Sequence, residues 1–356
     1  MDNGYLDQLV DAIQSKTNLL ARGGLTKTGI KTPPGTDILD LSTISGIREY
    51  NPSEYTFTAL AGTRLKDIHR MLSENNQFLP FDPPLVKNGA TLGGTVASNL
   101  SGPMRYHFGG VRDFILGVKF LNGQGQLIKS GGKVVKNAAG FDIPKLMVGS
   151  LGSLGTLIEF SFKVFPRPRE FITAISRFEN LHDALDSLVK LTSTPFEILC
   201  LDLAPIDNDY QVEIRMGGNA NLFQDRITHL GQQLDIESTL QGEQETKFWN
   251  GLNEFNWVPE GANLVKVPLI PKYVSSLDDF LAQHQAVRRY SAGVNVVWIA
   301  WSGSMDSLDQ KLKELNLMGL SILGSTDRVR VGSWNGSVFY DKIKDALDPS
   351  GVWVKV

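Results

Sequence analysis

The sequence predicts an α+β protein of two domains, and three observations support this fold class. The chain has 356 residues, more than the roughly 250–300 at which a single hydrophobic core stops growing. Residues 88–155 hold 15 of the 35 glycines and alternate glycine-rich turns with apolar runs. Beyond Pro166 and Pro168 the pattern changes to two β-α-β-like rounds, which is typical of an antiparallel sheet covered by helices.

The N-terminal part predicts short elements. Apolar residues at positions 6, 9, 10 and 13 recur at helical spacing and predict an amphipathic helix, with Asp2 and Asn3 as candidate caps. A glycine-containing loop follows over residues 21–29, and strands are expected at 38–41 and 55–61. Thr63 is expected to cap a helix that runs through Leu72 and ends by Asn76.

The second half predicts the cap domain. Residues 157–164 alternate apolar and polar side chains and predict a half-buried strand. The prolines that follow cannot continue a sheet ladder, so we expect one domain over residues 1–168, a cap over 169–325 and a C-terminal segment, 326–356, packed back on the first domain. Within the cap we expect strands at 171–175, 196–203, 210–216, 264–268, 295–301 and 320–323, helices at 181–188, 222–230 and 308–315, and a further element at 273–281.

The composition argues against several functional classes. A formal charge of −3 and a pI near 6.0 argue against nucleic-acid partners, which require a clustered basic surface. The single cysteine, Cys200, lies in an apolar run, so we expect a buried side chain, no intrachain disulfide and no iron–sulfur cluster built by this chain alone. The N-terminus lacks the features of a signal peptide, and no apolar run approaches about 18 residues, so we expect a cytoplasmic protein without a membrane span.

Three glycine-containing segments are candidate ligand loops. Residues 22–27 (RGGLTK) offer consecutive N–H groups, a hydroxyl and two cations, which suits a diphosphate, although a surface turn is the simpler alternative. Residues 91–99 (TLGGTVASN) have small side chains against which a ring or a diphosphate can lie. Residues 149–155 read G-x-x-G-x-x-G rather than the dinucleotide fingerprint, so a Rossmann NAD site is not expected.

Together these segments carry a family resemblance. The ordered set comprises RGGLTK, FDPP (81–84), TLGGTVASNLSGPMR (91–105), VRDFILGVKFLNGQG (111–125), KNAAGFDIPKL (136–146) and GSLGSLGTL (149–157). It resembles the FAD-binding domain of the vanillyl-alcohol-oxidase (PCMH-type) superfamily, and within it most of all the FAD-binding accessory subunits of bacterial glycolate oxidases. The resemblance implies a two-subdomain FAD-binding domain with an antiparallel α/β cap of ferredoxin-like rounds.

The resemblance also implies which residues contact FAD. The first loop would hold the diphosphate, and the later segments would line the cofactor with small side chains and backbone atoms. The implied cofactor-binding residues are Arg22, Gly23, Gly24, Leu25, Thr26, Lys27, Thr91, Gly93, Gly94, Ala97, Ser98, Asn99, Gly102, Arg105, Gly109, Gly155 and Ile158.

Three positions depart from the family pattern. Leu25 stands where the family often has another glycine, which implies a less close approach of the backbone to phosphate. No histidine occupies the first loop, so the implied FAD is noncovalent. The C-terminal KIKDALDPSGVWVKV lacks the family's usual asparagine-proline-glycine ending, which places the final turn in doubt.

The catalytic groups stay open at this point. His107, Arg105 and Lys136 are the candidates for a base or a carboxylate-binding cation, but Arg105 equally suits an ion pair with Asp113. The remaining histidines lie among polar residues in helical patterns and favour solvated side chains, and no metal site is expected.

The resemblance implies an FAD-dependent oxidoreductase acting on CH–OH groups. The expected protein is a subunit of a glycolate (2-hydroxy-acid) oxidase complex that passes electrons through flavin to an iron–sulfur subunit, beside a second flavin subunit, with membrane contact only through such partners. A stand-alone FAD dehydrogenase for a small hydroxy acid such as D-lactate, and a non-catalytic assembly subunit, are the alternatives. Five aromatic residues of the cap, at 249, 255, 257, 298 and 301, fit either core packing or an interface.

Overall fold

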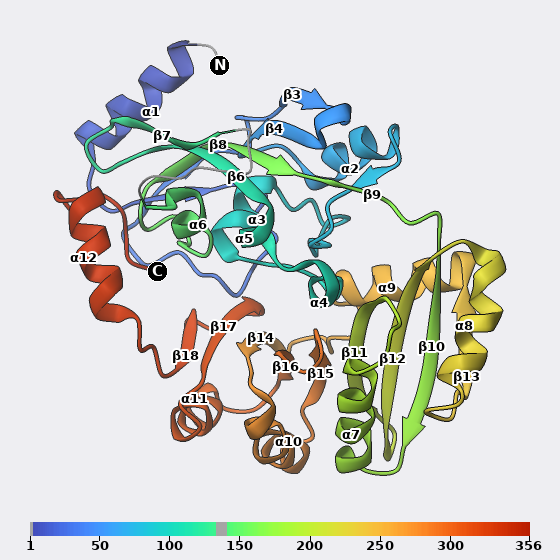
Figure 1. The fold of residues 1–356 in the computed structure, drawn as a ribbon. Helices are drawn as coiled ribbons and strands as arrows, with labels where there is room; N and C mark the ends of the chain where they lie inside the picture. The colour runs from blue at the N-terminus through green and yellow to red at the C-terminus, as the bar shows by residue number, and fades with distance from the viewer. Residues whose placement is uncertain (1–2, 133–140) are drawn as a thin grey trace.

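A computed structural model describes residues 3–132 and 141–356 (Figure 1). The N-terminal half is built on a five-stranded antiparallel sheet in the order β3-β4-β8-β6-β7. A parallel pair, β1 and β2, lies beside it, and the short β5 pairs with β9. The bounds are β1 Leu19–Arg22, β2 Asp37–Asp40, β3 Ile47–Asn51, β4 Thr56–Leu60, β5 Gln77–Phe78, β6 Ile115–Leu121, β7 Leu127–Gly131, β8 Thr156–Lys163 and β9 Phe165–Pro166.

Six helices surround this sheet. They are α1 Asn3–Ser15, α2 Leu65–Ser73, α3 Leu92–Ser98, α4 Arg105–Phe108, α5 Val111–Phe114 and α6 Ile143–Met147. The expected N-terminal helix is confirmed as α1, which buries Leu9 and Ile13; of its two candidate caps, Asp2 lies outside the described residues and Asn3 is the first residue of the helix. The cap predicted at Thr63 is wrong: the residue before α2 is Arg64, and the Thr63 hydroxyl instead accepts a 2.9 Å hydrogen bond from the Gly46 N–H.

The C-terminal half is built on a nine-stranded antiparallel sheet in the order β13-β10-β12-β11-β15-β16-β14-β17-β18. Its chain order is two successive βαββαβ rounds. The two predicted β-α-β-like rounds are present, and the structure adds β13 to the first and β15 to the second. The strands are β10 Glu170–Phe178, β11 Ile198–Ile206, β12 Asp209–Gly218, β13 Ser238–Gln241, β14 Asn263–Pro268, β15 Val287–Ser291, β16 Val296–Trp301, β17 Met318–Leu323 and β18 Arg330–Gly332; the helices are α7 Leu181–Thr192, α8 Phe223–Leu230, α9 Gly242–Asn253, α10 Val274–Gln283, α11 Met305–Glu314 and α12 Ser337–Leu347.

The two faces of this sheet have different neighbours. Apolar side chains of α7, α8, α10 and α11 pack with one face into a single core cluster. The opposite face meets the N-terminal half, because Leu264, Val296 and Trp298 belong to the core cluster that contains Phe57 and Phe160. Figure 1 shows α10 and α11 at the bottom, α7 and α8 beside the strands β10–β12, and the smaller sheet at the top. One face of the large sheet therefore packs against the cap helices, and the other face packs against the N-terminal half.

The passage between the halves differs in detail from the expectation. Pro166 still belongs to a two-residue ladder, in which it pairs with Gln77 of β5, and the Arg167 N–H donates a 2.7 Å hydrogen bond to the Asn76 carbonyl. Pro166 is compatible with this edge because the pairing uses only two residues. The boundaries at residues 168 and 325 stay predictions.

Four of the five aromatic residues considered in the cap pack in the core, and the fifth, Trp257, is half-buried. Trp249, Phe255, Trp298 and Trp301 are buried, and Cys200 is fully buried as expected. The sequence patterns missed α9, α12, β13, β15 and β18. Strand β15 has a charged interior, Arg288-Arg289, which hid it from a hydrophobicity pattern; both side chains are buried in ion pairs with Asp278 and Glu213.

Candidate functional site

The 22–27 loop begins where β1 ends and folds over the residues before α3. A Cβ on Gly23 would lie 2.6 Å from the Thr91 hydroxyl oxygen, and a Cβ on Gly24 would lie 2.4 Å from the Gly89 carbonyl oxygen. Both contacts are too short for any real side chain, so these two glycines let the loop approach the 89–91 backbone. Their role is to shape the loop, in addition to any contact with a ligand.

Leu25 holds the conformation that a glycine would take. Its φ is 52°, in the left-handed region, and its side chain is 71% exposed. Leu25 therefore takes a backbone conformation that favours glycine, and its side chain lies in solvent. Because Leu25 has a Cβ, this left-handed conformation strains its backbone.

Two cations of this loop are partly removed from water. Burial lowers the pKa of Lys27 to about 8, and the Lys27 ammonium donates a 3.2 Å hydrogen bond to the Thr26 hydroxyl. Arg22 donates through Nη2 to the Ile30 carbonyl at 3.0 Å, while its buried Nε has no partner among the described residues. Neither Lys27 nor the Arg22 Nε therefore has an anionic partner among the described residues. An anionic ligand could accept hydrogen bonds from both.

Helix α3 forms the opposite wall of this cavity. Thr91 caps it by accepting a 3.3 Å hydrogen bond from the Gly94 N–H, and Gly93 packs so closely on Ala61 that a Cβ there would lie at 2.8 Å. A Cβ on Gly94 would instead point toward the cavity, 3.7 Å from Lys27 Nζ. The cavity has a volume of about 80 Å³ and is lined by Ala21, Arg22, Gly23, Gly24, Leu25, Thr26, Lys27, Ile30, Thr91, Gly94, Ala97, Ser98 and Leu151.

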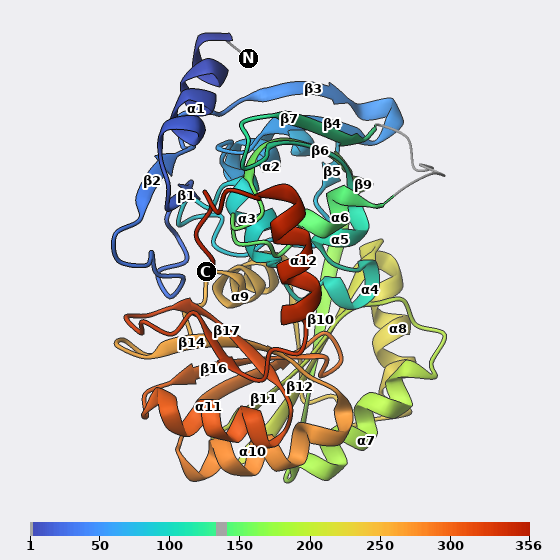
Figure 2. The same cartoon turned by 90° about the vertical axis from the view of Figure 1, so that its left-hand side faces the viewer.

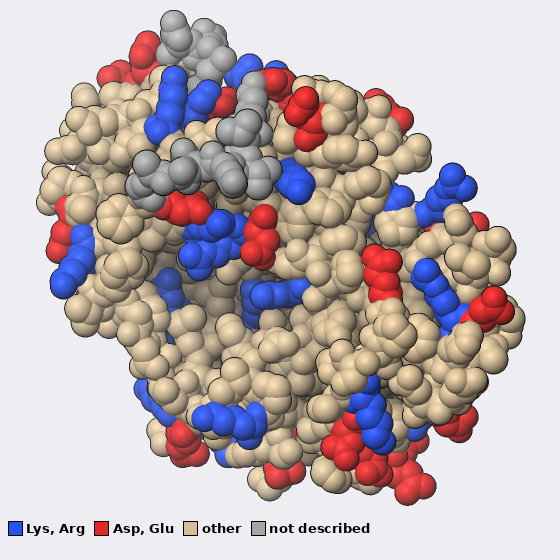
Figure 3. All heavy atoms as spheres, in the orientation of Figure 1, with Lys and Arg blue, Asp and Glu red and all other residues tan. Residues whose placement is uncertain are grey.

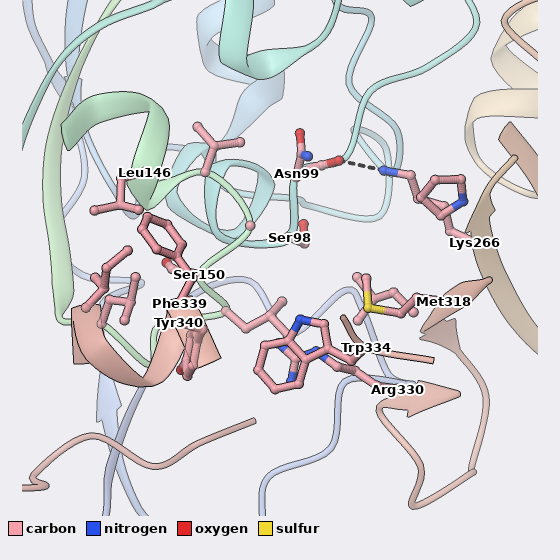
Figure 4. A pocket seen from close by; sticks show the side chains of 17 residues that line it. Ser98, Asn99, Leu146, Ser150, Lys266, Met318, Arg330, Trp334, Phe339 and Tyr340 are labelled. Atoms are coloured by element: carbon pink, nitrogen blue, oxygen red, sulfur yellow. Dashed lines mark hydrogen bonds between the residues drawn. The ribbon is translucent and has the colours of Figure 1, made fainter. Parts of the chain in front are cut away.

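A larger cavity, of about 270 Å³, continues from the first (Figure 4). Ser98 and Leu151 line both cavities, so the two cavities are neighbours, and we call them together the groove. The smaller cavity is lined by residues of the N-terminal half, and the larger one by residues of both halves. The larger cavity is mainly apolar, and the hydroxyl of buried Ser150 in its wall has no partner among the described residues. Its lining comprises Ser98, Asn99, Leu146, Val148, Gly149, Ser150, Leu151, Leu154, Lys266, Pro268, Met318, Leu320, Arg330, Trp334, Phe339, Tyr340 and Ile343.

The cap contributes two cations to this cavity, Lys266 from β14 and Arg330 from β18. Lys266 is 6% exposed, and its ammonium donates a 2.7 Å hydrogen bond to the Asn99 carbonyl. Burial, and secondarily the charge of Arg105, lower the pKa of Lys266 to about 7. Sequence reasoning missed both residues; a lysine inside the apolar strand 264–268 was the available signal.

The C-terminal segment forms the third wall. Tyr340 and Ile343 of α12 line the cavity, and the Tyr340 hydroxyl hydrogen-bonds the Ser153 hydroxyl. The segment continues to β1, where the Leu19 N–H donates to the Val352 carbonyl at 2.8 Å. Figure 2 shows α12 in front of the junction between the halves. The final residues thus pack against the N-terminal half without the ending usual in the family.

Six residues implied by the resemblance lie outside the groove linings described above, and one of them is Gly93, which packs on Ala61. Gly102 packs on Asp82 and Asn253, and Gly109 packs on Asp113. Gly155 lies against the Leu121 carbonyl, and Ile158 is fully buried in the core. Arg105 begins α4 near Lys266, and burial lowers its pKa against the opposing charge of Asp113.

The other candidate catalytic groups are dispersed. His107 Nε2 faces Glu197 at 3.4 Å on a partly exposed surface, and Lys136 lies outside the described residues. His69 departs from the expected solvated state: it lines a separate cavity with Arg167 and Arg215, and burial lowers its pKa. No group of three His, Cys, Asp or Glu residues within 3–132 and 141–356 is placed to hold a metal ion.

Comparison with known proteins finds a family match within the N-terminal half. Residues 7–131 match the family described as "FAD binding domain". The chain is 40% identical over 193 residues to "Glycolate oxidase subunit GlcE" of Escherichia coli, over 54% of this chain and 55% of that protein. It is 26% identical over 208 residues to "D-lactate dehydrogenase [cytochrome], mitochondrial" of Arabidopsis thaliana, over 58% of this chain and 35% of that protein. The matched regions therefore span about half or less of these relatives.

A solved structure shares the whole fold. An "alkyldihydroxyacetonephosphate synthase" superposes with a TM-score of 0.70 at 14% identity and covers 98% of this chain and 74% of that one. The predicted PCMH-type FAD-binding fold and its cofactor, FAD, are confirmed. None of the helices within the described ranges has the length and hydropathy to cross a bilayer.

Proposed function

We propose that this chain, which carries a PCMH-type FAD-binding domain, is the FAD-binding subunit of a complex that oxidises glycolate or a similar 2-hydroxy acid. Electrons would pass from the hydroxy acid through flavin to a partner iron–sulfur subunit. The observation that carries the proposal is the pair of neighbouring cavities that make up the groove. The cationic 22–27 loop with Lys27 lines the smaller cavity, and Lys266 of the cap lines the larger, mainly apolar one.

The residues of the groove fit FAD in two parts. The 22–27 loop, with Lys27 and the free Nε of Arg22, would hold the diphosphate, because both are donors without a carboxylate partner among the described residues. The apolar cavity would hold the ring system and exclude water from it, with Leu151 and Leu154 on one side and Leu320 on the other. When bound there, FAD supplies a hydride acceptor.

The cations of the larger cavity support an anionic reactant. Lys266 and Arg330 both lie in its lining, and Figure 3 shows Lys and Arg side chains around the hollow between the halves. A guanidinium binds a carboxylate through two parallel hydrogen bonds, so Arg330 is the group we assign to the carboxylate of a 2-hydroxy acid.

Relatives of two kinds support the main proposal and one of its alternatives. "Glycolate oxidase subunit GlcE" and "Glycolate oxidase subunit GlcD" of Bacillus subtilis are named as subunits, which supports a complex with a second flavin subunit. Several D-lactate dehydrogenases also match, which supports a stand-alone dehydrogenase as the second candidate. A cytoplasmic location, with membrane contact only through partners, goes with the first.

Flavin absorbance, and its loss on anaerobic reduction by substrate, distinguish the proposed subunit from a stand-alone dehydrogenase. The purified chain should show flavin absorbance near 450 nm, a general property of flavins, and a colourless protein that cannot be reconstituted with FAD would refute the cofactor assignment. Anaerobic bleaching by glycolate or D-lactate in the isolated chain would favour the stand-alone dehydrogenase. Bleaching only after co-purified companion chains are added would support the subunit, and identifying those chains would show whether one carries iron–sulfur clusters.

A further inference from the structure

Lys266 is a buried amine placed between the two halves of the protein. It lies in β14 between Val265 and Val267, whose side chains pack into the core under the cap helices. Because successive side chains in a strand point to opposite faces, the Lys266 side chain crosses toward the N-terminal half. There its Nζ donates to the Asn99 carbonyl at 2.7 Å (Figure 4). Asn99 is the C-cap of α3 and has a φ of 50°, so the lysine donates to the carbonyl of the residue that ends the helix.

No negative side chain balances this lysine in the cavity. The charged and titratable groups that line the cavity with it are Arg330 from β18 and Tyr340 from α12, and Arg105 from α4 acts on it electrostatically. Its neighbour across the sheet, Trp298, places its ring centre 5.9 Å from Nζ. Among the described residues that line the cavity there is no Asp or Glu. The one hydrogen bond and the ring only partly compensate for lost hydration, so the neutral amine is favoured.

A negative charge that enters the cavity would reverse this balance. In a medium of low polarity, charges a few ångströms apart interact much more strongly than in water. Lys266 holds its proton weakly near neutral pH, because burial lowers its pKa to about 7. An adjacent anion raises that pKa, and the amine then takes a proton from solvent.

We propose that Lys266 is a redox-linked proton acceptor: its amine takes up one proton when the flavin bound in this cavity gains two electrons. This inference rests on the proposed function, because it requires FAD to occupy the cavity. The electrons come from the hydroxy-acid donor, or from dithionite in a test. One proton accompanies them onto the ring system, which then carries a negative charge, and a second moves from solvent to Nζ, so that charge and protons balance.

The test is a spectroelectrochemical titration of the FAD-loaded chain and its variants between about pH 6 and pH 9, followed at 450 nm. Above about pH 7 the midpoint potential of the wild type should fall about twice as steeply with pH as that of Lys266→Met, because about two protons rather than one follow each electron pair. Lys266→Arg keeps the charge and the donor to Asn99 but does not titrate. It should show the shallow slope of Lys266→Met with a higher potential than that variant.

Lys247→Met, at an exposed lysine of α9, is the matched control and should keep the steep slope. Equal slopes for the wild type and Lys266→Met would overturn the inference while leaving FAD binding intact. A steep slope in Lys266→Arg would also overturn it, because the titrating group would then be another residue. A chain that binds no FAD would overturn the proposed function as well, so the two failures are distinguishable by colour alone.

Discussion

The ammonium of Lys344 donates a 2.9 Å hydrogen bond to the carbonyl of Ser153 and so joins the C-terminal helix to the glycine-rich loop of the groove. The same ammonium reaches the Trp353 carbonyl at 2.7 Å and forms an ion pair with Asp348. Asp348 is buried and also accepts hydrogen bonds from the Val352 and Trp353 N–H groups. The third wall of the groove is therefore held by one small polar cluster.

Lys344→Met should lower the free energy of unfolding by about 3 kcal/mol, because it leaves the Asp348 carboxylate buried without its cation. Denaturant unfolding measures this change. Lys355→Met is the control: its ion pair with Asp341 is exposed, so that variant should lose less than about 1 kcal/mol. A loss at Lys344 no larger than at Lys355 would contradict the role given to the cluster.

Gly94→Val should abolish FAD retention while the cap stays folded. The added side chain would fill the space between α3 and Lys27, where a Cβ already lies 3.7 Å from Nζ. The flavin content after gel filtration measures retention, and circular dichroism checks the fold. Gly251→Val is the matched control, because that helical glycine of α9 has only Asn256 nearby, at 3.9 Å. Normal flavin occupancy in Gly94→Val would contradict the placement of the cofactor.

Leu25→Gly should stabilise the folded loop or leave its stability unchanged, and FAD should still bind. Glycine adopts φ near 52° without the strain of a side chain, a gain of about 1 kcal/mol that is partly offset by the greater freedom of glycine in the unfolded chain. Thermal unfolding with and without FAD measures both effects. Leu25→Val should lose stability, because a β-branched residue is poorly tolerated at positive φ, and equal stability of the two variants would argue against strain.

FAD affinity should weaken above about pH 8. The amine of Lys27 loses its proton near that pH in the ligand-free protein, whereas the charged form is the one that binds a diphosphate. The dissociation constant should therefore rise by up to about tenfold per pH unit above pH 8. Fluorescence titration with FAD from pH 6 to pH 10 measures it. Lys27→Arg should bind without this pH dependence, and Lys27→Met should bind weakly at every pH; a wild-type profile as flat as theirs would refute the assignment.

The lowered pKa of Lys27 also affects the stability of the ligand-free protein. Stability should increase with pH, whereas FAD affinity should decrease. Lys27 binds its proton less tightly in the folded than in the unfolded protein, so between about pH 8 and pH 10.5 the unfolded chain holds more protons. In the absence of FAD, the contribution of Lys27 to the free energy of unfolding therefore rises with pH across that window. Lys27→Met should remove this rise in ligand-free denaturant titrations, and persistence of the rise in that variant would assign it to another group.

Much of the fold could be predicted because its signals are local. Helix α1 and strand β8 follow from apolar spacing, and two β-α-β-like rounds follow from the alternation of such segments. The elements that were missed have signals that depend on distant partners. Strand β15 looks polar until Asp278 and Glu213 pair with its arginines, and α12 buries none of its side chains completely.

The fold of the cofactor-binding half could be predicted from local sequence, because glycine spacing and small side chains are requirements of the backbone that hardly depend on the rest of the molecule. The sequence predicted the Arg22–Lys27 loop and the α3 segment as neighbours of a ligand, and in the structure both line the same cavity. The residues that line the groove from the cap and the C-terminal segment could be found only in the folded structure. Lys266, Arg330 and Tyr340 reach it from β14, β18 and α12, and the burial that lowers the pKa of Lys266 exists only once the large sheet packs against Asn99. Burial and charge balance are properties of packing between distant segments, so no local pattern contained them.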